Sequence, residues 1–182
     1  MIANMRYAKV RRLVPAGSVL CDLGCGPDGR FLQALLDSGT ISKGYGFDRN
    51  VDRVRERGEM VLSPLDLNSG IPLQGASIDC VTMLALLEHL SKPAAVIEDV
   101  FRVLKPGGRI ILTTPSPCSK ALLEFLAFRL QLISAEEIRD HKRYYSETDL
   151  RALLGDKSFT GVVYKRFQFG LNQLVAASKP AT

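Results

Sequence analysis

The stretch Val19-Leu20-Cys21-Asp22-Leu23-Gly24-Cys25-Gly26-Pro27-Asp28-Gly29 decides the fold. It joins an apolar run typical of a buried strand to a glycine-rich turn, and a predicted helix over residues 31–36 follows. Glycine lets the backbone turn sharply and approach a ligand with no Cβ in the way, and the first N–H groups of a helix are free to bind it. We therefore expect a nucleotide-type ligand at this turn.

The spacing of the glycines agrees with a dinucleotide-binding fingerprint. Gly24, Gly26 and Gly29 follow the G-x-G-x-x-G pattern, and Asp48 lies about 20 residues further on, where a ribose-binding carboxylate is expected. NAD, a flavin and S-adenosylmethionine all satisfy this pattern. The turn alone therefore predicts a class of ligand and not one compound.

Composition indicates one globular domain over residues 1–182. The chain is 46% hydrophobic and 24% charged, which is typical of a soluble protein with a substantial core. Its four cysteines form no C-x-x-C pair, and Cys21 and Cys80 fall in predicted buried strands. We expect free thiols, a reducing compartment and no metal site.

The net charge of +5 comes from basic clusters near the N-terminus, around residues 49–57 and around residues 139–143. Such clusters can face phosphates, but no aromatic side chains are interleaved for base stacking, so solvated helix faces are favoured over nucleic-acid binding. Residues 1–14 lack the long apolar core of a secretory signal. A cytoplasmic location is the resulting expectation.

The hydrophobic pattern predicts strands alternating with helices. Strands are expected at 19–23, 43–48, 60–63, 79–84 and 109–114, and helices at 31–36, 51–57 and 94–104, with 105–108 as a helix stop and turn. A short amphipathic helix, with Ile2, Met5 and Leu13 at helical spacing, precedes them. After a capped start at Ser146, a helix at 150–154 leads to strands at 159–167 and 171–177, whose tight connection makes them antiparallel. Alternation of this kind predicts a mostly parallel sheet covered on both faces.

Several sequence blocks, in one order, resemble the class I S-adenosylmethionine-dependent methyltransferases, especially the small group typified by ubiquinone and menaquinone methylases. The blocks are Asp22–Gly29, Gly46–Asp48, Asp66-Leu67, Asp79–Val81 leading to Leu87–Leu90, and Leu104–Arg109. The resemblance is close over residues 13–115, loose over 141–178 and absent over 116–140. It implies a Rossmann-like doubly wound sheet of seven strands, mostly parallel with one antiparallel strand near the C-terminus.

The resemblance also implies S-adenosylmethionine as the cofactor and S-adenosylhomocysteine as its product. Asp48 would accept the ribose hydroxyls, Asp22 the ammonium group, and Asp66 the adenine amino group, although Asp66 could instead be a turn-former. Leu67 would pack on the adenine ring. The full set of cofactor-binding residues that it implies is Asp22, Gly24, Cys25, Gly26, Gly29, Asp48, Arg49, Asp66, Leu67 and Leu84.

Methyl transfer from a sulfonium is an in-line displacement that requires alignment and exclusion of water, and a histidine suits removal of the acceptor proton near neutral pH. His141 is the preferred general base, and His89 is the second candidate, with a packing role as its alternative. In some relatives a Glu-His pair and a second glutamate hold a divalent metal. Ala85 takes the place of that glutamate here, so we expect no metal.

Residues 121–133 form a predicted helix that is apolar around most of its circumference. It is too short to span a bilayer, which takes about 20 apolar residues. Within the insert 116–140 it is expected as a lid over an apolar small-molecule acceptor; a dimer contact, an interfacial membrane anchor and a helix buried in its own domain are the alternatives. The oligomeric state stays open.

Three other functions compete with methylation of a small molecule. A catalytically inactive S-adenosylmethionine-binding module would keep the pocket without the chemistry. An RNA methyltransferase is disfavoured because Leu84–Leu87 stand where base-amino methylases carry an Asn-Pro-Pro-Tyr type of motif. A NAD-dependent oxidoreductase would share the glycine turn, but Asp22 and the Lys-Pro-Gly-Gly block at 105–108 argue against it.

Overall fold

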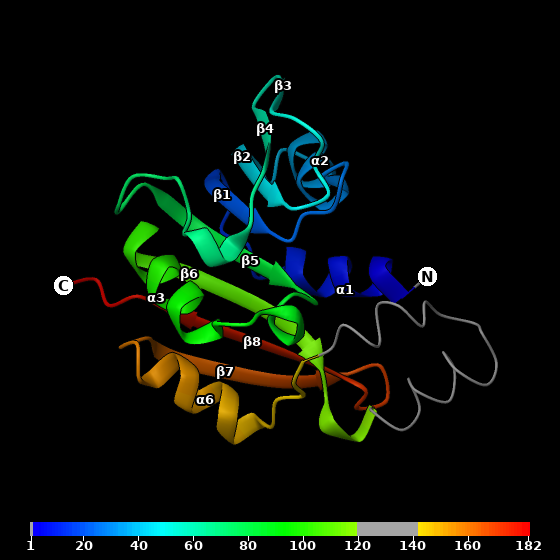
Figure 1. Cartoon of the computed structure of the whole chain (residues 1–182), viewed down its shortest axis with the longest axis vertical. Helices are drawn as coiled ribbons and strands as arrows, with labels where there is room; N and C mark the ends of the chain where they lie inside the picture. Colours follow the sequence, from blue (N-terminus) through cyan, green and yellow to red (C-terminus); the bar gives the residue numbers. More distant parts are fainter. Residues whose placement is uncertain (1, 120–141) are drawn as a thin grey trace.

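Eight strands form one sheet with helices on both faces in the computed structural model, which describes residues 2–119 and 142–182 (Figure 1). The strands are β1 (Ser18–Leu23), β2 (Ile41–Asp48), β3 (Arg55–Arg57), β4 (Met60–Pro64), β5 (Ile78–Leu84), β6 (Leu104–Pro115), β7 (Thr160–Phe167) and β8 (Asn172–Ser178). The helices are α1 (Ile2–Arg11), α2 (Arg30–Asp37), α3 (Pro93–Val103) and α6 (Glu147–Gly155), with 3-10 turns η1 (Leu67–Ser69), η2 (Leu87–His89) and η3 (Pro117–Ser119).

The order across the sheet is β3-β4-β2-β1-β5-β6-β8-β7. Strands β4, β2, β1, β5 and β6 are parallel, and β8 runs antiparallel to both β6 and β7. The carboxyl ends of the five parallel strands therefore meet at one edge, called the carboxyl edge below. Chain order reverses on either side of β1, which makes its end the switch point where such sheets bind ligands.

The predicted fold class is confirmed, but the sheet has eight strands where seven were expected. The added strand is β3, a three-residue segment antiparallel to β4. It replaces the helix predicted over residues 51–57. Val51 and Val54 are spaced as on one helix face, yet Val51 is buried and Val54 is 59% exposed. Gly58, at φ +58°, allows the tight turn into β4 that a hairpin requires.

Two core clusters fill the space between the sheet and its helices. In β1, Cys21 and Leu23 face the cluster that includes residues of α3 and α6, whereas Leu20 faces the cluster that includes residues of α1 and α2. The same alternation holds along β5, where Cys80 packs on the α1 and α2 side. The predicted burial of Cys21 and Cys80 is thereby confirmed, and the inner strands are covered on both faces, as expected for a parallel sheet.

Residues 105–108 were predicted as a turn between a helix and a strand. Helix α3 does end at Val103, but β6 begins at Leu104 and includes all four residues. The pairing of β6 with β5 shifts register between Ile78 and Cys80, so these residues form a bulge within one long strand. Gly107 has φ +77°, a conformation that favours glycine.

The ends of the chain agree with the predicted elements, with one correction. Ser146 and Asp149 form a reciprocal capping box at α6, and β7 and β8 are antiparallel. Helix α1, however, ends at Arg11, before the predicted position Leu13, and the predicted apolar position Met5 is 47% exposed, whereas Val10 is fully buried. The predicted helix over 121–133 lies outside the described residues.

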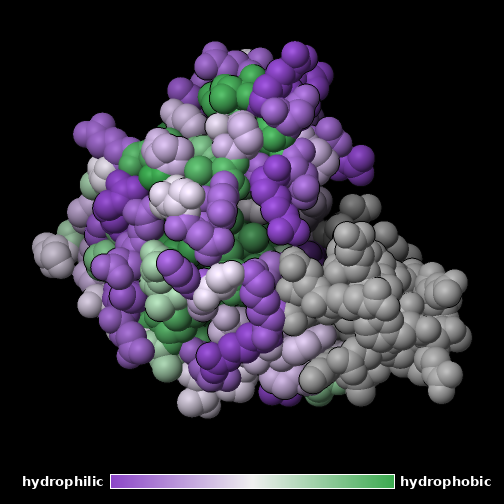
Figure 2. All heavy atoms as spheres, in the orientation of Figure 1, coloured by the Kyte–Doolittle hydropathy of each residue, from purple (hydrophilic) through white to green (hydrophobic). Residues whose placement is uncertain are grey.

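Figure 2 shows that the face seen in Figure 1 is mostly hydrophilic, with hydrophobic atoms in small patches. Among residues 2–119 and 142–182, no helix has both the length and the apolar character needed to cross a membrane.

Candidate functional site

The glycine turn leaves the end of β1 at the carboxyl edge and is anchored to β2. Gly24 donates its N–H to the Phe47 carbonyl over 2.8 Å. Gly24 and Gly26 have φ values of +74° and +72°, in the region that side chains rarely adopt. A Cβ at Gly24 would lie 3.0 Å from Leu86, whereas a Cβ at Gly26 would meet no atom within 4 Å. The turn therefore exposes bare backbone to open space at Gly26.

The carboxylate of Asp48, at the end of β2, is held against this open turn. Its Oδ2 accepts the Gly26 N–H over 2.8 Å, and its Oδ1 accepts the Asn50 N–H over 2.8 Å. Each carboxylate oxygen can accept a further hydrogen bond. The arrangement thus offers two oriented acceptors beside exposed backbone, which suits a ligand carrying adjacent hydroxyl groups.

Asp22 lies under the turn, within β1, and is 2% exposed. Its Oδ1 accepts a 2.6 Å hydrogen bond from the Thr82 hydroxyl, which faces it from β5 in the paired register. Burial raises the pKa of Asp22 to about 7, and the nearby charge of Asp48 adds to the rise, while the Thr82 hydrogen bond opposes it. A buried carboxyl group with such a pKa is suited to binding a cation that restores its charge.

Replacing Asp22 by Asn is expected to weaken the binding of an ammonium-bearing ligand about tenfold at pH 8, because a charge-assisted hydrogen bond becomes a neutral one. Wild-type affinity should rise between pH 6 and 8, as the carboxyl group with a pKa of about 7 ionises, and the variant should lose this rise. Calorimetric titration of the wild type and the variant at pH 6 and pH 8 measures this difference in affinity. A parallel pH dependence in the two proteins would contradict the role of Asp22.

The same substitution should stabilise the empty protein. Since the pKa of Asp22 is raised from 3.8 in the folded state, the stability that the protonated group confers is complete below about pH 4 and is lost as the pH rises to about 7. Asparagine carries no charge at any of these pH values. Asp22→Asn should therefore raise the melting temperature more at pH 8 than at pH 5, as followed by circular dichroism.

Asp66 and Leu67 lie after β4, at the same edge. The Asp66 carboxylate caps η1 by accepting the Asn68 backbone N–H over 2.9 Å and its amide over 2.7 Å, and these bonds lower its pKa. The alternative of a turn-former is thus realised, and a further ligand contact at Asp66 stays a prediction. Leu67 packs into the core and is 8% exposed. Arg49 is exposed and contributes to the electrostatic environment of Asp66.

The other predicted cofactor residues have packing roles in the structure. A Cβ at Gly29 would lie 2.7 Å from Leu62, so this glycine lets α2 approach β4. The Cys25 thiol is buried, donates to the Gly26 carbonyl over 3.3 Å and has a pKa raised by burial. Leu84 ends β5 and is 9% exposed. Their contact with a ligand stays a prediction.

A buried carboxylate, Glu88, lies in η2 after the end of β5, and sequence patterns indicate it only as half of a metal site. Glu88 is 1% exposed; its Oε2 accepts the Thr114 hydroxyl over 2.9 Å, and its Oε1 has no hydrogen-bond partner within residues 2–119 and 142–182. Burial raises its pKa. His89 follows it in η2, while His141 lies outside the described residues. Within the described ranges, no three His, Cys, Asp or Glu side chains gather in a group that could hold a metal ion.

Arg6 is a candidate that the sequence does not reveal, because a basic segment near the N-terminus favours a solvated helix face. Its Nε is buried and has no hydrogen-bond partner among the described residues, and burial lowers the pKa of Arg6 while the charge of Glu88 opposes this change. Tyr7 packs against Phe31, with ring centroids 4.8 Å apart. Figure 1 shows α1 beside the tip of β5. A cationic side chain is therefore brought to the carboxyl edge from the far end of the sequence.

The chain is similar in sequence to known proteins. A family model described as a methyltransferase domain matches residues 4–163. A ubiquinone biosynthesis O-methyltransferase from Idiomarina loihiensis is 25% identical over 90% of this chain and 76% of its own length. A protein of transposon TN4556 from Streptomyces fradiae is 33% identical over 54% of this chain, but the match spans only 30% of that protein.

Solved structures share the fold at low sequence identity. An S-adenosylmethionine-dependent methyltransferase from Mesorhizobium loti has a TM-score of 0.72 at 17% identity, covering 94% of this chain and 96% of that one. Phosphoethanolamine N-methyltransferase 2 of Haemonchus contortus, in complex with S-adenosyl-L-methionine, has a TM-score of 0.74 at 14% identity, covering 97% of this chain and 52% of that one.

Proposed function

The chain belongs to the methyltransferase domain family, and from this premise we propose that it transfers a methyl group from S-adenosylmethionine to a small, apolar acceptor molecule. The observation that carries the proposal is the grouping of Asp22 and Asp48 around the open backbone at Gly26. These groups match an ammonium, a ribose diol and an extended methionine chain. S-Adenosylhomocysteine is the expected product.

Each charged part of S-adenosylmethionine has a counterpart at the carboxyl edge. Asp48 would accept the ribose hydroxyls, and Asp22 the ammonium group. Arg6, whose buried Nε has no partner among the described residues, is the candidate for the methionine carboxylate, since a half-buried guanidinium favours an anion. Asp66 and Leu67 would bind adenine. Gly24, Cys25, Gly29, Arg49 and Leu84 complete the proposed set.

When bound, S-adenosylmethionine supplies an electrophilic methyl carbon, so the protein has to orient the acceptor and exclude water. The buried environment of Glu88 supports a dry site on this side of the edge. His89 and His141 remain the proposed general bases. Glu88 Oε1, which has no partner in the described structure, is a further acceptor for a proton-bearing group.

An apolar acceptor is supported by the positions of the described residues that flank the apolar sequence 121–133. Ser119, in η3 just beyond the end of β6, precedes the apolar sequence 121–133, and after it the Lys142 N–H bonds the Glu88 carbonyl over 2.8 Å. The described residues on either side of that sequence, Ser119 and Lys142, therefore lie at the carboxyl edge. This placement supports its proposed role as a lid over the acceptor.

The acceptor class is tested by incubating the purified chain with methyl-labelled S-adenosylmethionine and a cell extract, then separating the small molecules extracted by organic solvent from protein and RNA. Label in an organic-soluble small molecule is the expected result. Label confined to protein or RNA would contradict the acceptor class. Binding without any transfer would favour the inactive binding module.

A further inference from the structure

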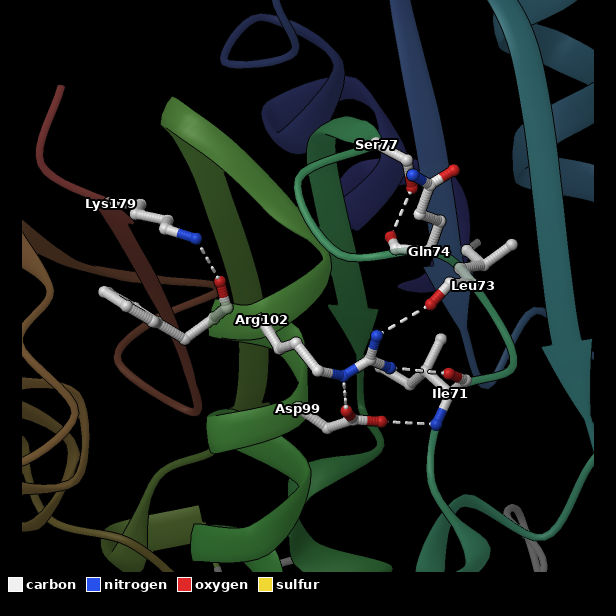
Figure 3. Close-up of polar contacts among 8 residues, drawn as sticks. Ile71, Leu73, Gln74, Ser77, Asp99, Arg102 and Lys179 are labelled. Atoms are coloured by element: carbon white, nitrogen blue, oxygen red, sulfur yellow. Dashed lines mark hydrogen bonds and ion pairs between the residues drawn. The ribbon is translucent and has the colours of Figure 1, made fainter. Parts of the chain in front are cut away.

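Helix α3 is tied to the loop that precedes β5 by one arginine. The guanidinium of Arg102 donates from Nη2 to the Ile71 carbonyl and from Nη1 to the Leu73 carbonyl, each over 2.7 Å, and from Nε to Asp99 Oδ1 over 2.5 Å (Figure 3). Three separate N–H groups are thus used in one plane. A lysine ammonium cannot reproduce this fork.

Asp99 completes the contact from the same helix. While its Oδ1 accepts from Arg102, its Oδ2 accepts the backbone N–H of Ile71. Ile71 is therefore held through both its N–H and its carbonyl, as the dashed lines in Figure 3 show. We call Asp99 and Arg102 the α3 clamp. Hydrogen bonds with an ionised partner are stronger than neutral ones, which favours one loop geometry.

The helix that carries the clamp is itself firmly placed. Its apolar face, with Val96, Ile97, Val100 and Val103, is buried in the core. At its C-terminal end, Lys179 Nζ donates to the carbonyls of Phe101 and Leu104, each over 2.8 Å. The α3 clamp therefore acts from a fixed base onto a loop that has no regular secondary structure.

The clamped loop continues directly from η1. Leu67, in η1, and Ile71 are buried in the same core cluster, and only Asn68, Ser69 and Gly70 separate them. Gly70 has φ +92°, and a Cβ there would lie 3.5 Å from Asp99 Oδ2. A shift of Ile71 would therefore be transmitted to Leu67 and to Asp66 before it.

We infer that Asp99 and Arg102 are positioning residues that set Asp66 and Leu67 for the adenine of the cofactor, an inference that rests on the proposed function. η1 is three residues long and is capped by Asp66 itself, so apart from the packing of Leu67 its position depends on the loop that follows it. The α3 clamp supplies this restraint from the other side of the loop. Its loss should act on adenine selectivity more than on the methionine half of the site.

The test compares S-adenosylhomocysteine with S-inosylhomocysteine, in which an oxo group replaces the adenine amino group. The wild-type chain should prefer the adenine compound about fivefold, the contribution of one hydrogen bond. In Arg102→Met this preference should fall to near unity, and in Asp99→Asn it should fall part of the way. Both compounds are titrated by calorimetry into protein that circular dichroism shows to be folded.

Arg151→Met is the matched control. Arg151 also bonds a carboxylate of its own helix, Glu147, over 2.9 Å, and the carbonyl of Val162 over 3.2 Å, but it lies on α6. The preference of Arg151→Met for the adenine compound should equal that of the wild type. Equal losses of affinity for the two compounds, or an unchanged preference in Arg102→Met and Asp99→Asn, would overturn the positioning role of the α3 clamp and leave the proposed function standing. A wild-type chain that binds neither compound would overturn the proposed function and the inference with it.

Discussion

Asp48→Ala is expected to lower the affinity for S-adenosylmethionine at least about 100-fold. Two ribose hydroxyls lose a charged acceptor, and hydrogen bonds to charged groups contribute about 1.5–3 kcal/mol each. The substitution also releases the N–H groups of Gly26 and Asn50, which this carboxylate holds over 2.8 Å each. The glycine turn therefore loses its orientation together with its ligand contacts. Calorimetric titration of the purified variant measures the effect.

The matched control for this substitution is Asp37→Ala. Asp37 is an exposed carboxylate at the end of α2 that accepts a side-chain hydrogen bond from Gln33 over 2.6 Å. Its removal should leave cofactor affinity unchanged within about twofold, the usual range for such surface sites. If Asp48→Ala also stayed within this range, the assignment of the ribose site to the end of β2 would be wrong.

Gly26→Ala is expected to have the second largest effect. It should lower both the stability of the fold and the affinity for the cofactor, for two different reasons. A left-handed φ of +72° costs a non-glycine residue about 1–2 kcal/mol, so the free energy of unfolding should fall by about that amount. The new Cβ meets no protein atom within 4 Å, which leaves the fold otherwise undisturbed. It would, however, occupy the open space where the proposed cofactor passes the backbone. Affinity should fall about 5- to 150-fold, because overpacking a filled site costs about 1–3 kcal/mol.

Gly39→Ala provides the comparison, because Gly39 has φ +64° and a Cβ added there would likewise meet no atom within 4 Å. It follows α2, at the end away from the glycine turn. Chemical denaturation should show similar losses of stability in both variants, with cofactor affinity lost only in Gly26→Ala. Equal affinities in the two would show that no ligand lies against Gly26.

Local sequence patterns predicted the parallel core of the sheet because its strands are buried on both faces and read as apolar runs. The helix predicted over residues 51–57 was wrong, in a segment where only a few apolar residues indicate a helical face. The spacing of Val51 and Val54 fits one helical face, but the antiparallel pairing of β3 with β4 through Gly58 determines the local structure. Hairpin pairing depends on a partner strand, which a helical spacing rule does not consider.

The candidate site was predictable where its residues belong to contiguous motifs. The glycine turn and Asp48 are such cases. Contacts between distant residues were not predictable: Asp22 and Thr82 are 60 positions apart, and the register of β1 with β5 brings them to 2.6 Å. Arg6 and the α3 clamp are of the same kind. Their roles depend on burial and on partners that a single sequence does not specify.

The central claim is that the edge at Gly26 and Asp48 binds S-adenosylmethionine. It is tested most directly by calorimetric titration of the purified chain with S-adenosylmethionine and, separately, with NAD. The predicted result is one binding site for S-adenosylmethionine, whose affinity Asp48→Ala lowers at least about 100-fold, and no heat of binding with NAD. Binding of NAD without binding of S-adenosylmethionine would contradict it.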